Sequence, residues 1–138
     1  MKVAQLGTDS VLFTPTAAAT TARTASLDCQ GATYATIRVM LGVELNTNST
    51  NVALSLSEGD DTNTYTTFNA TANRTVDNTA ATIATTHVDL EGRKRYLKIT
   101  ATPDTTTNGP VTVAMNATLY KNLITDSATM LGPAVAIV

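Results

Sequence analysis

The chain has 138 residues, which is the size of one domain able to bury its own hydrophobic core. Only 14% of the residues are charged and the net charge is −2, so the sequence lacks the strongly basic surface that nucleic-acid binding requires. Threonine makes up much of the remaining polar fraction, and this β-branched residue favours strands over helices.

The N-terminal region, residues 1–30, is expected to contain an arm and the first strands of a single domain spanning residues 1–138. Residues 15–26 place alanines among threonines and offer no clear apolar face, so we expect an extended arm there. The segment after Met1 is too short and polar for a signal peptide, and no apolar run in the chain is long enough to cross a bilayer. A soluble protein with no membrane partner is therefore predicted.

The clearest element is a strand over residues 32–45. Its odd-numbered positions are apolar, whereas its even-numbered positions include Tyr34 and Arg38, and this period of two indicates one buried and one exposed face. Turn-forming residues follow, and a second alternating strand over residues 52–57 is expected to pair with the first as a β-hairpin. The expected core residues of these strands are Ala35, Ile37, Val39, Leu41, Val43, Leu45, Val52, Leu54 and Leu56.

Four further strands are expected in the second half of the chain. They lie at residues 65–70, 82–90, 95–102 and 111–119. The first is weak and has Phe68 as its apolar anchor, and a polar loop is expected at residues 73–81. A charged turn at residues 91–94 separates the second from the third. The expected inward-facing residues of the last three strands are Ala84, Thr86, Val88, Leu90, Leu97, Ile99, Ala101, Val111, Val113, Met115, Ala117 and Leu119.

Short strands joined by turns rich in glycine, asparagine and aspartate predict an all-β fold. We expect an antiparallel β-sandwich or jelly roll with its core at residues 31–120 and extended N- and C-terminal arms. The tail at residues 121–138 ends in an apolar stretch, and its Val135, Ile137 and Val138 are expected to contact a neighbouring subunit or partner. The alternative is that the tail adds one more strand to its own sheet.

Residues suited to catalysis or metal binding are sparse. His87 is the single histidine and is expected on the polar face of a strand beside Asp89, without the other members of a catalytic triad or a zinc site. Cys29 is the single cysteine, so no internal disulfide can form and a reducing compartment is expected. The acidic stretch at residues 58–61 lacks the ligand spacing of a calcium loop. We therefore expect no metal, no cofactor and no enzyme activity.

The turn Arg93-Lys94-Arg95 is a cluster of three cationic residues. Such a cluster is usually only solvated, but it could also dock on an acidic surface of a partner protein. Its charge density is too low to follow a nucleic-acid backbone, and no aromatic stripe accompanies it. This turn and the apolar tail are the predicted partner-binding regions.

The segments at residues 34–39, 54–61 and 88–97, the last with the sequence VDLEGRKRYL, resemble small virion proteins of tailed bacteriophages, including head decoration (cement) proteins. The resemblance covers residues 30–120 and brings no catalytic residues. It implies a β-sandwich on the exterior of the capsid, often as a trimer. The expected function is therefore a structural virion protein, made in the host cytoplasm, that stabilises a bacteriophage capsid by bridging subunits of the major capsid protein.

Two alternative functions stay open. A head fibre base, a tail component or an adaptor protein would share the fold and differ only in its place in the virion. A carbohydrate-binding module is also possible on a β-sandwich. Such modules use exposed aromatic side chains, and this chain has no tryptophan and four tyrosines.

Overall fold

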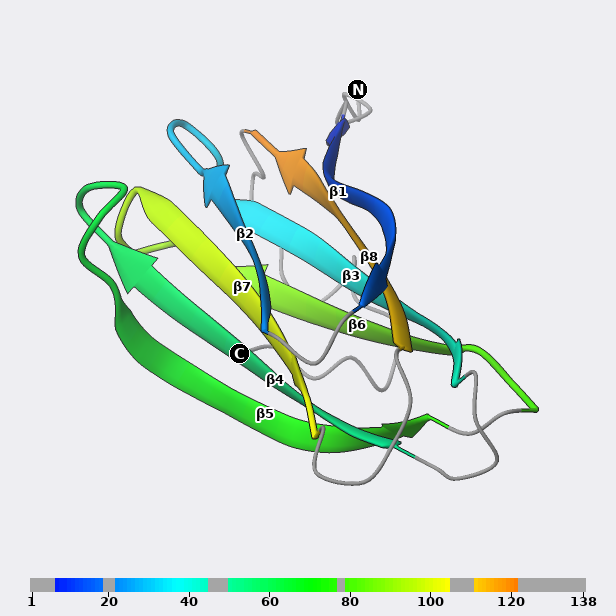
Figure 1. Ribbon diagram of the computed structural model, residues 1–138. Helices are drawn as coiled ribbons and strands as arrows, with labels where there is room; N and C mark the ends of the chain where they lie inside the picture. The colour runs from blue at the N-terminus through cyan, green and yellow to red at the C-terminus, as the bar shows by residue number, and fades with distance from the viewer. Residues whose placement is uncertain (1–6, 19–21, 45–49, 77–78, 105–110, 122–138) are drawn as a thin grey trace.

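The computed structural model describes residues 7–18, 22–44, 50–76, 79–104 and 111–121, and none of these ranges contains a helix long and apolar enough to cross a membrane. They form two four-stranded antiparallel sheets that pack face to face (Figure 1). Sheet A has the strand order β1-β8-β3-β6, and sheet B has the order β2-β7-β4-β5. The strands are β1 (Gly7–Ala18), β2 (Arg23–Asp28), β3 (Tyr34–Glu44), β4 (Thr50–Gly59), β5 (Thr66–Val76), β6 (Thr82–Asp89), β7 (Tyr96–Pro103) and β8 (Val111–Tyr120).

The hydrophobic core lies between the two sheets and is built from alternate residues of the strands. In β3, for example, every second side chain from Ala35 to Leu41 is at most 4% exposed, as the period of two requires for a strand with one buried face. The predicted antiparallel β-sandwich is thus confirmed. Val43 and Leu45, also expected in the core, lie outside the described side chains. The largest fully buried apolar side chains are Ile37, Leu41, Val52, Val76, Val88, Leu97, Ile99, Val111, Val113 and Met115.

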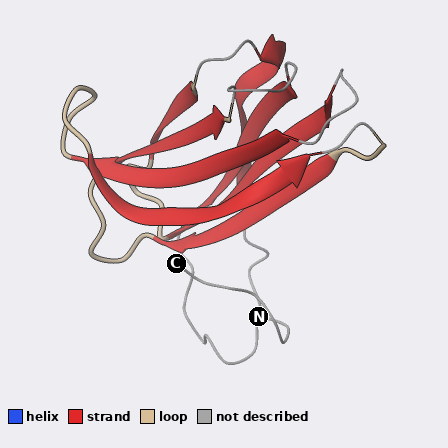
Figure 2. Ribbon diagram, turned by 60° about the horizontal axis from the view of Figure 1, so that its bottom comes forward, coloured by secondary structure: helices blue, strands red, loops and turns tan. Residues whose placement is uncertain are grey.

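Most successive strands belong to different sheets, in the manner of a jelly roll. Only β4 and β5 are both consecutive and hydrogen-bonded to each other, and Figure 2 shows the two layers from a second direction. The predicted hairpin between residues 32–45 and 52–57 is therefore wrong, because β3 lies in sheet A and β4 in sheet B. The charged turn at residues 91–94 likewise joins β6 of sheet A to β7 of sheet B. Alternation identifies the buried face of a strand, but it does not identify the hydrogen-bonding partner.

The N-terminal region contains strands where an arm was expected. The prediction of an extended arm at residues 15–26 is wrong for the described residues of that stretch, because β1 pairs with β8 and β2 pairs with β7. Within β2, Ala25 and Leu27 are buried in the core. These two residues give β2 an apolar face too short to stand out in a threonine-rich sequence.

The other difference in strand length concerns β5. This strand continues to Val76, which is fully buried, so part of the polar loop predicted at residues 73–81 is a strand paired with β4. The backbone hydrogen bonds to β4 hold this polar segment in the sheet. The C-terminal tail at residues 122–138, including Val135, Ile137 and Val138, lies outside the described residues.

Two short connections at one end of the sandwich are built alike, and we call them the two corners. The first is Asp28-Cys29-Gln30-Gly31 after β2, and the second is Asp89-Leu90-Glu91-Gly92 after β6. In each corner an oxygen of the aspartate accepts a hydrogen bond from the backbone N–H two residues later, at 3.0 Å and 2.9 Å. Gly31 and Gly92 have φ angles of 74° and 75°, which glycine adopts without strain in such turns. Each corner leads the chain from one sheet to the other.

Candidate functional site

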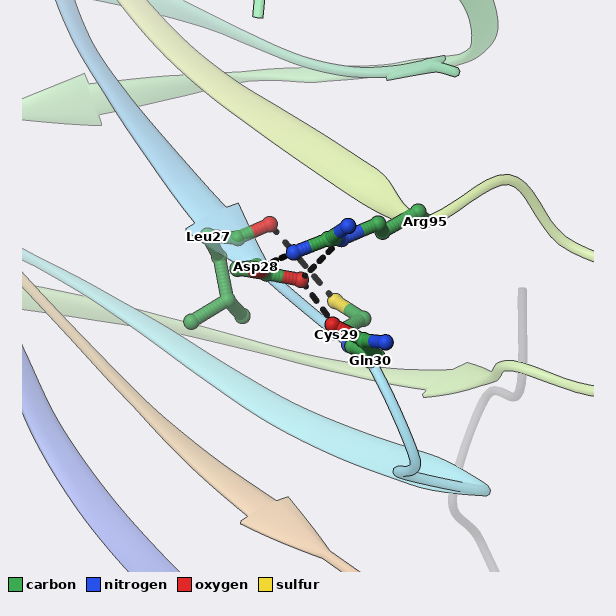
Figure 3. A network of polar contacts seen from close by, with 5 residues as sticks. All are labelled: Leu27, Asp28, Cys29, Gln30 and Arg95. Atoms are coloured by element: carbon green, nitrogen blue, oxygen red, sulfur yellow. Dashed lines mark hydrogen bonds and ion pairs between the residues drawn. The ribbon is translucent and has the colours of Figure 1, made fainter. Parts of the chain in front are cut away.

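The cationic turn predicted to bind a partner is tied to sheet B by ion pairs. The guanidinium of Arg95 contacts both carboxylate oxygens of Asp28, at 3.0 Å and 2.7 Å, as Figure 3 shows. The hydrogen bonds from Arg95 and from the backbone N–H of Gln30 lower the pKa of Asp28 below its ordinary value. This bidentate pair therefore fixes the end of the turn beside the first corner.

The other two cations of the turn also have acidic partners. The Lys94 ammonium lies 2.6 Å from Asp60 Oδ2, and the hydrogen bond to this carboxylate raises the pKa of Lys94. The Arg93 guanidinium lies 3.7 Å from Glu58 and stacks over the Phe68 ring at 4.0 Å from its centroid. The turn thus carries three internally compensated charges. That Arg93, Lys94 and Arg95 also contact a partner stays a prediction.

On the outer face of sheet B, side chains are bound mainly to one another. The Tyr65 hydroxyl donates a hydrogen bond to Ser26 Oγ at 3.2 Å, and the Lys98 ammonium lies 4.6 Å from the Tyr65 ring centroid. Gly59 leaves room for this arrangement, because a Cβ atom there would overlap the Thr64 carbonyl oxygen and lie 3.2 Å from the Tyr65 ring. Tyr65, which immediately precedes β5, therefore connects the β4–β5 turn with β2 and β7.

The outer face of sheet A carries three rings in contact, which we call the aromatic cluster. Tyr34 begins β3, His87 lies opposite Thr36 on β6, and Tyr120 ends β8. The ring centroid of Tyr34 lies 5.9 Å from that of His87, with the planes nearly parallel at 28°, and 5.8 Å from that of Tyr120, with a tilt of 57°. These are favourable distances for aromatic pairs. Because β3 lies between β6 and β8, the cluster crosses three strands.

Burial favours the uncharged forms of two members of the aromatic cluster, His87 and Tyr34. His87 Nδ1 lies 3.2 Å from Thr36 Oγ1, within hydrogen-bonding distance. Burial, followed by the nearby positive charge of Arg38, lowers the pKa of His87 below its usual 6.5. Burial, followed by Tyr120 and Asp89, raises the pKa of Tyr34. The predicted position of His87 on the polar strand face beside Asp89 agrees with the structure.

Arg38 lies farther along β3 on the same outer face as the aromatic cluster. Its cross-strand neighbours are Thr85 on β6 and Asn116 on β8, and neither is charged. Among the described side chains, Arg38 makes no ion pair. Two polar atoms of this face, the Tyr34 hydroxyl and Asn116 Oδ1, are enclosed without a hydrogen-bond partner in the described part of the chain. Such groups are rare in folded proteins and call for a structural reason.

The described residues contain no group of three or more His, Cys, Asp or Glu side chains placed to hold a metal ion. Cys29 is buried, and its Sγ lies 3.8 Å from the carbonyl oxygen of Leu27. The imidazole of His87 is bound to Thr36 and stacked on Tyr34, so its described contacts are those of a ring in a packed face.

The aromatic cluster and Arg38 were not predicted as functional residues, although part of the signal is in the sequence. Tyr34 and Tyr120 are adjacent to inward-facing residues, so the alternation places both on an outer face. Arg38 occupies an outward position of the same strand as Tyr34. The grouping of the rings depends on β3 lying between β6 and β8, which the strand pattern alone does not reveal.

No protein-family model and no curated protein sequence matches the chain. Among solved structures, the chain is similar to the CBM22-1 xylan-binding domain of Paenibacillus barcinonensis Xyn10C. The match has a TM-score of 0.49 and 11% sequence identity, and it covers 70% of this chain and 64% of that domain, which is less than two thirds of its length. At this level of similarity the match does not define a shared activity.

The predicted function as a capsid cement protein is contradicted by these comparisons. The matched structure is a xylan-binding domain and not a virion component, and no family model supports the resemblance to phage proteins. The interpretation depended on three segments that the structure assigns mainly to strands and to the two-sheet connection at residues 91–94, and these are features of the fold. The major capsid protein as partner, the trimer and the virion location depended on that function and stay predictions.

Proposed function

We propose that this protein is a non-catalytic glycan-binding domain whose binding surface is the outer face of sheet A. The observation that carries the proposal is the aromatic cluster of Tyr34, His87 and Tyr120. One face of a sugar ring presents C–H groups that pack on an aromatic ring, while its hydroxyls need hydrogen-bond partners around that ring. The outer face of sheet A offers both kinds of contact.

The polar groups around the aromatic cluster support the same function. Arg38 and Asn116 are partly exposed on the same face, and their side-chain N–H groups can donate hydrogen bonds to sugar hydroxyls. Farther along the face, Met40 lies opposite Ile83, whose side chain is 63% exposed. An extended glycan lying along β3 would therefore meet rings, then polar groups, and then apolar surface.

The two outer faces of the sandwich differ in how much they offer a ligand. On sheet B, Tyr65 already gives its hydroxyl to Ser26 and its ring to Lys98, and the Arg95 guanidinium lies 4.9 Å from the Tyr96 ring centroid. The rings of sheet A contact one another, and Arg38 on the same face makes no ion pair with the described side chains. This difference favours sheet A as the binding face.

The proposal is tested by affinity electrophoresis and calorimetry with a panel of soluble polysaccharides that includes xylan. We expect at least one polysaccharide to bind, and we expect Tyr34→Ala to weaken that binding about tenfold or more, because a packed ring contributes on the order of 1–2 kcal/mol. Tyr120→Ala is the second test variant, in case Tyr34→Ala lowers folding stability.

Tyr96→Ala is the matched control, since Tyr96 begins β7 on sheet B as Tyr34 begins β3 on sheet A. Its affinity should stay within about twofold of the unaltered protein. Circular dichroism and thermal unfolding confirm that each variant is folded. The proposal is wrong if no polysaccharide binds, or if Tyr96→Ala loses as much affinity as Tyr34→Ala and Tyr120→Ala.

A further inference from the structure

Arg38 is a cation that the described residues leave without a counter-charge. It lies on β3, the strand between β6 and β8, with uncharged Thr85 and Asn116 as its cross-strand neighbours. On β6, the acid of this face is Asp89, which pairs with Tyr34, four residues from Arg38 along β3. At about 3.3 Å per residue this separation is roughly 13 Å, too far for an ion pair.

Other cations of the protein contrast with Arg38. Arg93, Lys94 and Arg95 each have a carboxylate within 4 Å, and Lys98 lies over the Tyr65 ring. Arg38 is only partly exposed, which limits how far water can solvate its charge. A guanidinium has planar N–H donors, and the group that matches them best is a carboxylate.

The surroundings of Arg38 fit the carboxylate of a sugar better than that of an amino-acid side chain. The aromatic cluster lies on the same face, beginning at His87 opposite Thr36, two residues from Arg38. Asn116 lies directly across from Arg38 on β8 and is partly exposed, so its side-chain N–H group can donate a hydrogen bond to a sugar hydroxyl. One face therefore combines ring stacking, hydroxyl recognition and one positive charge.

We infer that the glycan bound by this domain is acidic, with the carboxylate of a uronic acid unit paired to Arg38 while a neighbouring sugar packs on the aromatic cluster. This inference rests on the proposed function. Arg38 then selects acidic glycans, whereas the rings contribute affinity that does not depend on the charge of the sugar. The charge on the sugar then decides which polysaccharides bind most tightly.

Two pairs of polysaccharides with the same backbone test the inference. Polygalacturonate is compared with its methyl ester, and alginate with its propylene glycol ester, by calorimetry on the full chain at low and high ionic strength. We expect at least one free acid to bind ten times or more tightly than its ester, with much of the difference lost in 0.5 M salt because the added contact is an ion pair. Dextran sulfate is the arm that separates carboxylate from sulfate recognition.

Arg38→Gln should bring the affinity for the free acid down to that for the ester. Arg74→Gln, at an exposed arginine on β5 of sheet B, is the matched control and should retain the preference. The inference is overturned if acid and ester bind equally, if Arg38→Gln keeps the preference, or if dextran sulfate binds while both free acids do not. Binding of neutral polysaccharides alone would refute the acidic preference and leave the proposed function standing. Failure of all polysaccharides would refute both.

Discussion

Each sheet has four strands, but the outer faces of the two sheets differ in the contacts that their polar groups make. On sheet B, hydrogen bonds and charge contacts run between side chains: Tyr65 to Ser26, Lys98 to the Tyr65 ring, and Ser57 to Thr67 at 3.0 Å. On sheet A, Arg38 makes no ion pair with the described side chains. A face that satisfies its own groups contributes to stability, whereas a face that does not is the better candidate for recognition.

The largest expected effect is at Gly59, beside Tyr65 on the outer face of sheet B. Gly59→Ala should lower the free energy of unfolding by about 2–3 kcal/mol, because the new Cβ would overlap the Thr64 carbonyl oxygen and crowd the Tyr65 ring. Urea unfolding measures the change. Gly42→Ala on sheet A is the control, with a smaller expected loss because its Cβ would lie 3.0 Å from Thr112 Cβ, a contact that a small shift relieves. Equal losses of stability in the two variants would contradict the expected difference in steric room at Gly59 and Gly42.

The next effect is a difference in sign between two tyrosines. Tyr34→Phe removes an enclosed hydroxyl that has no partner among the described residues, so the free energy of unfolding should stay the same or rise by up to about 1 kcal/mol. Tyr65→Phe removes the hydrogen bond to Ser26 and should lower stability by about 0.5–1 kcal/mol. Urea unfolding of both variants gives the comparison. A clear loss of stability in Tyr34→Phe would show that its hydroxyl is satisfied in solution.

A smaller effect should appear as a dependence of stability on pH. The pKa of His87 is lower in the folded protein than its usual 6.5, so the unfolded chain takes up the proton first as the pH falls. Stability from this group is complete above about pH 6.5 and declines as the pH falls from there toward the folded pKa. Urea unfolding between pH 7.5 and 5 should show the decline, and His87→Gln should reduce it. An unchanged profile in this variant would show that another group is responsible.

The smallest effect is expected at the exposed ion pair of the cationic turn. Lys94→Met removes the contact with Asp60, and the melting temperature should change by less than about 2 °C because exposed pairs contribute little. Arg93→Met should lower it more, since Arg93 also stacks on Phe68 and its side chain is only 29% exposed. Thermal unfolding distinguishes the two. A larger loss in Lys94→Met than in Arg93→Met would reverse this ranking.

The sequence carried enough information to predict most of the buried faces. Residues 35–41 and 97–101 alternate so regularly that their inward side follows from the pleat of a strand. The assignment of strands to sheets could not be predicted in this way, because β3 next to β4 in a hairpin would bury the same side chains as β3 and β4 in opposite sheets. Long-range packing of the complete chain decides between them. Part of β5 was missed because its residues 73–75 are polar.

The candidate site was less accessible to prediction than the fold. Alternation is sufficient to place Tyr34, Arg38 and Tyr120 on outer faces, but the proximity of Tyr34 to His87 depends on the β3–β6 register. The missing counter-charge of Arg38 is also a property of three neighbouring strands. In contrast, the cationic turn was conspicuous in the sequence. Its carboxylate partners come from β2, β4 and the turn after β4, so the neutralisation of its charges could not be predicted before those elements were placed.

The reactivity of Cys29 in the first corner can be used to measure local opening of the protein. Burial, followed by the negative charge of Asp28, raises the pKa of Cys29 to about 12, and the backbone N–H of this residue donates a 2.8 Å hydrogen bond to the Arg95 carbonyl oxygen. Because the thiolate is the form that attacks alkylating reagents, this buried sulfur is protected at neutral pH for as long as the corner stays closed. The rate of alkylation therefore reports how often the chain opens at the connection from sheet B to sheet A. The native cysteine is sufficient for this measurement, so no cysteine has to be introduced.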